Sequence, residues 1–113
     1  MDEQALTDFM TLLDKKGVSL LMLRIQDIAL ERDDALLAVK LLERASMPIL
    51  GGDVYFERNS AIEPAHANWY TDRGRDEAYD SYLRRSWEGA MKYITTFPKR
   101  TDVKPLFSLV IRK

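Results

Sequence analysis

Two glycines and an acid stand in the middle of MPILGGDVYF, residues 47–56, and the aromatic run NWYTD follows at residues 68–72. Pro48 is expected to end a preceding helix, because proline lacks the N–H that a helix interior needs. Residues 54–57 are rich in β-branched and aromatic side chains, which is typical of a strand. Residues 69–71 have a similar composition and are predicted to pair with it. This part of the chain therefore predicts a helix followed by a β-hairpin.

The connection inside the hairpin is expected to be irregular. Asn59-Ser60 and Glu63-Pro64 are turn-forming pairs between the two predicted strands. The Gly51-Gly52 pair comes after a helix and before a strand, the reverse of the order in a phosphate-binding loop. We therefore expect the glycines to allow a positive φ or a close backbone approach at a tight turn.

Helices are predicted on both sides of the hairpin from apolar residues spaced i, i+3, i+4 and i+7. A first helix is expected over residues 2–15, with Gly17 at its C-cap. A short second helix is expected after Ser19, a third from Asp33 to the turn before Pro48, and a long fourth over residues 76–96. Four sets of side chains carry this pattern: Leu6, Phe9, Met10 and Leu13; Val18, Leu21, Met22 and Ile25; Ala35, Ala38, Val39 and Leu42; and Tyr79, Tyr82, Leu83, Ala90, Tyr93, Ile94 and Phe97.

A last strand is predicted over residues 106–111, where the chain is uncharged and enters after Pro105. A helix between the second and third strands favours a crossover that places the third strand beside the first, on the side away from the second. The expected fold is α+β, in the order α-α-α-β-β-α-β. About three antiparallel strands would pack against three main helices.

The chain has 113 residues, a length that predicts one domain over residues 1–113. Cysteine is absent, which excludes disulfides, thiol catalysis and cysteine-zinc sites and fits a reducing compartment. Charged residues interrupt every hydrophobic segment before it reaches the length of a membrane span. The acidic start, Asp2-Glu3, is unlike the basic segment of a signal peptide. We therefore expect a cytoplasmic protein.

Charge is distributed unevenly along the chain. Residues 1–80 hold 9 Lys+Arg and 16 Asp+Glu, a net charge of 9 - 16 = -7, whereas residues 81–113 hold 8 and 2, a net charge of +6. Such polarity can steer a charged partner. Alternatively, the two regions interleave in the folded chain to give an ordinary mixed surface.

Strand alternation selects the candidate binding residues. Asp53, Tyr55 and Glu57 fall on one face of the first hairpin strand, and Val54 and Phe56 fall on the other, toward the helices. An antiparallel sheet with one solvated face would show this pattern, and the acids would also suit a cationic partner. Of Trp69 and Tyr70, one should be buried and one exposed, and the strand register decides which.

The residue types in the chain suggest two other functions, metal-dependent hydrolysis and nucleic-acid binding. Asp53, Glu57, His66 and Asp72 lie in or beside the hairpin and could hold a divalent metal in a hydrolase, although no metal-ligand spacing supports this. The basic last third of the chain could bind nucleic acid. Its cations are Arg84, Arg85, Lys92, Lys99, Arg100, Lys104, Arg112 and Lys113. The acidic first two-thirds argues against a dedicated nucleic-acid binder.

The segment LGGDVY at residues 50–55, with NWY at residues 68–70 and the helix from Asp33 to Arg44, resembles the immunity protein 40 family of bacterial polymorphic toxin systems. The resemblance covers residues 29–72. It implies a protein that binds and neutralises a cognate toxin, with no catalysis of its own. We expect no metal and no cofactor.

The contact surface is predicted from strand alternation rather than from the family. The candidate partner-binding residues are Asp53, Tyr55, Glu57, Tyr70 and Asp72. Their charge would suit a basic region of a toxin, such as a nuclease whose active site binds phosphates. A standard interface of roughly 800 Å² per partner fits on a domain of this size.

Overall fold

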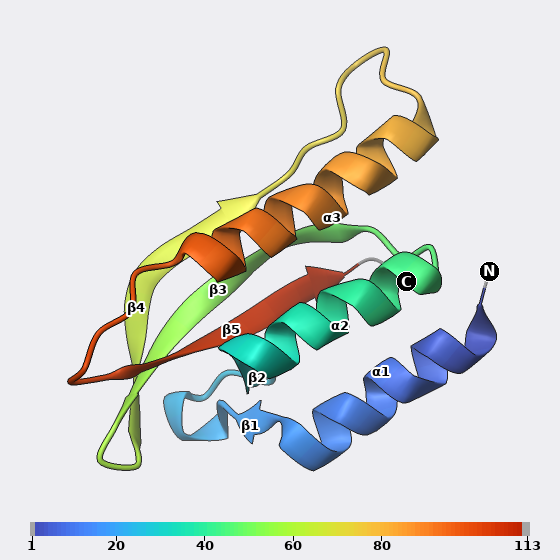
Figure 1. Ribbon diagram of the computed structural model, residues 1–113. Coiled ribbons are helices and arrows are strands. Elements are labelled where there is room, and N and C mark those ends of the chain that lie inside the picture. The colour runs from blue at the N-terminus through green and yellow to red at the C-terminus, as the bar shows by residue number, and fades with distance from the viewer. Residues whose placement is uncertain (1, 112–113) are drawn as a thin grey trace.

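The computed structural model describes residues 2–111, which form a five-stranded antiparallel sheet and three α-helices (Figure 1). The helices are α1 (Glu3–Lys16), α2 (Arg32–Arg44) and α3 (Tyr79–Thr96), and a 3₁₀ turn, η1, spans Leu21–Leu23. The strands are β1 (Val18–Ser19), β2 (Ile28–Glu31), β3 (Ile49–Arg58), β4 (Ala61–Tyr70) and β5 (Lys104–Ile111). The α+β class is confirmed, but this part of the chain has five strands rather than three.

The strands are ordered β1-β2-β5-β3-β4 across the sheet, and each neighbouring pair is antiparallel. The prediction that the last strand lies beside the first hairpin strand, away from the second, is confirmed. Helices α2 and α3 lie against one face of the sheet, and α1 lies alongside α2 (Figure 1). None of the helices within residues 2–111 is long and apolar enough to span a bilayer.

The predicted short second helix is wrong. The chain forms β1, the single turn η1 and β2 instead, and Arg24 has a left-handed φ of 61° that ends the turn. Leu21 and Met22, which suggested a buried helical face, are each 62% exposed. Pairing of Leu30 with Phe107 extends the sheet at this point, so a long-range contact decides the local structure.

The other helices agree closely with the prediction. The side chain of Asp2 accepts a hydrogen bond from Ala5 N (3.1 Å) at the start of α1, and Gly17 N donates to Leu13 O at its end. Helix α3 begins at Tyr79 rather than residue 76, because residues 71–78 form a loop. Tyr79, expected on the buried face, is 47% exposed in this first turn.

The main core lies between the sheet and the helices. Its least exposed side chains include Leu30, Val39, Leu42, Ile49, Val54, Ile94 and Phe107. A smaller apolar cluster lies on the opposite face of the sheet, where Leu20 and Ala29 pack against Tyr55, Ile62 and Leu106. Residues from β1 through β2 therefore cover part of the face that the sequence predicted to be open.

The hairpin is longer and more regular near its tip than predicted. Asn59 and Ser60 both have positive φ, 51° and 67°, in a two-residue turn between strands of ten residues each. The irregularity lies within β4, where Val54 is opposite Ala67 and Tyr55 is opposite Pro64. This register shift leaves two residues of β4 as a bulge, and one of them, His66, has a φ of 56°.

The two glycines lie inside β3 rather than in a turn, and neither has a positive φ. A Cβ on Gly52 would collide with the Trp69 indole and lie 2.6 Å from Ser108 O. A Cβ on Gly51 would collide with the backbone of Trp69. The expectation of close approach is therefore confirmed, and the expectation of a positive φ is wrong.

Candidate functional site

The two faces of β3 carry the side chains that alternation predicts. Val54 is 2% exposed in the helix-side core, and the Phe56 ring lies 6.2 Å from that of Phe97, just after α3. Asp53, Tyr55 and Glu57 lie on the opposite face. Register also separates the two aromatics of β4, because Trp69 stacks on Tyr93 of α3 at 4.6 Å whereas Tyr70 is 75% exposed.

Tyr55 does not lie on a solvated face, so this part of the prediction is wrong. Its side chain is 7% exposed because it packs against Leu20, which lies between β1 and η1, and against Ala29 of β2. Burial raises the pKa of the Tyr55 phenol, and the carboxylates of Asp53 and Asp27 raise it further. The phenol therefore stays neutral and supports the sheet from within rather than presenting itself to a partner.

Beyond Tyr55, more of the same sheet face is exposed, although Ser108 in the first row is buried. Here Asp53 is opposite both Asn68 of β4 and Ser108 of β5, and in the next row on this face Gly51 is opposite Tyr70 and Val110. Asn68 is exposed, Asp53 is half-buried, and Val110 is 42% exposed. We call the surface formed by Asp27, Asp53, Asn68, Tyr70 and Val110 the open face.

Asp27 belongs to the open face through a contact that the sequence pattern did not indicate. Its Oδ2 accepts a 2.6 Å hydrogen bond from the hydroxyl of Ser108, which is fully buried, and its Oδ1 accepts from Ile28 N (2.8 Å). Within residues 2–111, neither Asp27 nor Asp53 forms an ion pair with a lysine or arginine. The open face is therefore acidic, with an apolar side chain and a tyrosine beside the acids.

Asp72 lies at the rim of the open face, in the loop that follows β4. The loop is held to α3 by Arg85, whose Nη2 donates to Asp72 O (2.6 Å) and to Glu77 Oε1 (2.7 Å). Glu77 also accepts from Gly74 N (2.8 Å) and Ser81 Oγ (3.2 Å). Hydrogen bonding to Arg85, then to Gly74, lowers the pKa of Glu77 to about 2. Asp72 is therefore an exposed residue on a loop that these hydrogen bonds hold in place.

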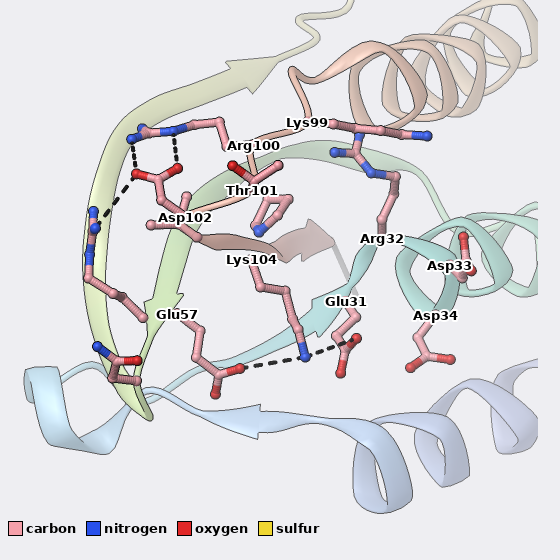
Figure 2. A pocket seen from close by; sticks show the side chains of 14 residues that line it. Glu31, Arg32, Asp33, Asp34, Glu57, Lys99, Arg100, Thr101, Asp102 and Lys104 are labelled. Atoms are coloured by element: carbon pink, nitrogen blue, oxygen red, sulfur yellow. Dashed lines mark hydrogen bonds and ion pairs between the residues drawn. The ribbon is translucent and has the colours of Figure 1, made fainter.

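Glu57 faces a different environment from Asp53. It borders a charged cleft of about 800 Å³ at the hairpin end of the sheet, where Lys104 Nζ lies 3.5 Å from Glu31 and 3.8 Å from Glu57 (Figure 2). On the other side of the cleft, the Arg100 guanidinium binds both carboxylate oxygens of Asp102 at 2.9 and 2.6 Å. This pairing lowers the pKa of Asp102.

The charged cleft is neutralised internally. Its lining includes five cations and five acids, and Arg32 donates to the carbonyls of Ile94 (2.6 Å) and Phe97 (2.8 Å) at the end of α3. Such contacts tie the start of α2 to the end of α3, where a cation also suits the helix dipole. The cleft offers no net charge to an incoming phosphate.

Part of the basic C-terminal third is therefore mixed with acids in the folded chain, which is the second of the two alternatives for the charge pattern. Arg85, Arg100 and Lys104 pair with acids, whereas Arg84, Lys92 and Lys99 form no ion pair within residues 2–111. Arg112 and Lys113 lie outside the described residues.

The residues proposed for a metal site are not brought together. His66 and Asp53 border the same small hollow at the β4 bulge, but Glu57 lies at the charged cleft and Asp72 beyond the end of β4. Among residues 2–111, no three histidine, aspartate or glutamate side chains gather closely enough to hold a metal ion. The open face, by contrast, is an exposed surface that another protein could contact.

Comparison with known proteins gives one match. No curated protein and no solved structure matches the chain significantly. The family model of immunity protein 40 matches residues 17–111, which include β1 through β5, the open face and the loop that carries Asp72. Because the match covers most of the 113 residues, the chain belongs to the immunity protein 40 family.

Proposed function

We propose that this protein binds and neutralises a cognate toxin of a bacterial polymorphic toxin system, in the cytoplasm of the cell that makes the toxin, and has no catalysis of its own. The family match over residues 17–111 is the observation that carries the proposal. The uncovered, acidic sheet surface supports it, because a protein without catalysis must act through a surface on which another molecule can bind.

We further propose that the open face and its rim contact the toxin. Asp53 and Asp72 supply negative charge, and Tyr70 supplies a large side chain that is already exposed. Aromatic residues commonly dominate the energy of an interface, whereas charges mainly set the association rate. Tyr55 lies beside this surface, covered by Leu20 and Ala29, and Glu57 lies beyond Tyr55 at the charged cleft, where Lys104 offsets its charge.

The function is tested by co-expression with the C-terminal domain of a large toxin encoded beside this gene. The chain should restore growth to cells that express the toxin domain, and the two proteins should co-purify as a stable complex. Growth arrest despite abundant folded chain, together with no complex, would contradict the proposed function.

The surface is tested by a double charge reversal, Asp53→Lys with Asp72→Lys. The association rate with the toxin domain should fall by roughly tenfold or more at low salt, and the difference from the native chain should shrink at high salt. A matched control is Asp8→Lys with Glu43→Lys, which reverses two exposed acids on α1 and α2. Association rates are measured by stopped-flow or surface-based kinetics, and melting curves check that both double variants fold. Equal association rates for the two double variants would contradict the proposed surface.

A further inference from the structure

Resting on the proposed function, the geometry points to a specific mode of binding: we propose that an extended, basic segment of the toxin adds as a sixth strand to the outer edge of β4 at Asn68 and Tyr70. Strand β4 is at the edge of the sheet, next to β3 alone. Edge strands carry unpaired N–H and C=O groups that can bind another chain.

The backbone register identifies which groups point outward. Thr71 N donates to Leu50 O (2.8 Å), so this opposite pair is hydrogen-bonded. In an antiparallel ladder, hydrogen-bonded and non-hydrogen-bonded pairs alternate. The pairs of Trp69 with Gly52 and Ala67 with Val54 therefore bond inward. Asn68 and Tyr70, in the intervening pairs, direct their N–H and C=O groups to the outer edge.

The same alternation shows that this edge is interrupted on both sides of residues 67–70. Pro64, opposite Tyr55, also falls at an outward-facing position, where it has no N–H to offer. The bulge at His66 interrupts the strand, and beyond Tyr70 the carbonyl of Asp72 already accepts from Arg85. The longest uninterrupted part of the open edge is therefore residues 67–70, a stretch without proline or charge. At the opposite edge of the sheet, β1 has only two residues.

The neighbouring side chains indicate what an added strand should carry. Side chains opposite Asn68 and Tyr70 would project on the open face, in line with Asp53 and near Asp72. Lysine or arginine at alternate positions would meet these acids, and an apolar residue would pack beside the Tyr70 ring. A second copy of this chain fits less well, because edge-to-edge pairing of β4 would bring the acids of two open faces toward each other.

A proline substitution can distinguish the contribution of the backbone to binding from that of the side chain. Asn68→Pro removes an outward N–H that the fold does not use, as Pro64 already does in the same strand, whereas Asn68→Ala removes only the side chain. We expect the Kd for the toxin domain to rise about tenfold or more in Asn68→Pro, from a lost hydrogen bond and a blocked edge, and about threefold or less in Asn68→Ala. Equal affinities of the two variants would overturn strand addition.

Two further measurements keep the result decisive. If Asn68→Pro does not fold, amide exchange by NMR on the native chain replaces it: Asn68 and Tyr70 should exchange quickly when free and slowly in the complex. Fast exchange in both states would overturn the proposal.

Light scattering of the free chain should give a monomer, and a dimer that Asn68→Pro dissociates would assign the edge to a second copy. A native chain that does not bind the toxin domain at all would instead contradict the proposed function.

Discussion

Single residues set how closely the hairpin packs on α3, and Gly52 is the clearest case. The Trp69 indole lies over this glycine and stacks on Tyr93 of α3. Because Trp69 faces the helices, its neighbour Tyr70 projects from the open face. The absence of a side chain at residue 52 thus allows the register that exposes Tyr70.

Gly52→Ala should lower the free energy of unfolding by about 1–3 kcal/mol, since the new methyl group collides with Trp69 and crowds Ser108 O. The matched change Gly89→Ala lies within α3, where a Cβ would lie 3.4 Å from Thr71 Oγ1, an ordinary contact. It should stabilise the protein by up to about 1 kcal/mol, because alanine is the better helix former. Urea unfolding of both variants checks this, and shifts of the same sign would contradict the packing argument.

At the scale of elements, the loop between β4 and α3 depends on the Glu77 carboxylate. Its folded pKa of about 2 lies below the ordinary 4.5, so its ionised form is favoured in the folded protein. The resulting stability is complete above about pH 4.5 and is lost as the pH falls toward 2.

Glu77→Gln should therefore lower the Tm at pH 7 and have a progressively smaller effect from pH 4.5 down to about 2, because protonation weakens the same contacts in the native chain. Glu88→Gln, at an exposed position of α3 with no ion pair within residues 2–111, serves as the control at each pH. Calorimetric melting curves across this range would refute the role of Glu77 if its substitution had the same effect at every pH.

Elements also show where sequence reasoning succeeds and fails. The strongly periodic α1 and α2 agree with the prediction within a few residues, because local propensity and burial favour the same structure there. Residues 18–31 have helical spacing too, yet β2 pairs with β5, more than seventy residues away. No local pattern encodes that pairing, so the covering of Tyr55 could not be predicted.

At the scale of the whole molecule, the sequence predicts the layer on which α2 and α3 pack but not the limits of the exposed surface. Alternation places Asp53, Tyr55 and Glu57 on one face correctly. Long-range packing then gives them different environments: Leu20 and Ala29 cover Tyr55, Glu57 lies beside Lys104, and Asp53 is half-buried on the open face. Asp27 joins the open face only through its contact with Ser108, a pairing of residues 81 positions apart.

The central claim, that the toxin binds the open face, is tested most directly by titrating the toxin domain with the Tyr70→Ala variant in a calorimeter. Tyr70 is 75% exposed, so its removal should leave the fold and the Tm almost unchanged. If Tyr70 is a central contact, binding should weaken by about 2 kcal/mol or more, roughly a 30-fold rise in Kd. An unchanged Kd would contradict the account and move the binding surface elsewhere.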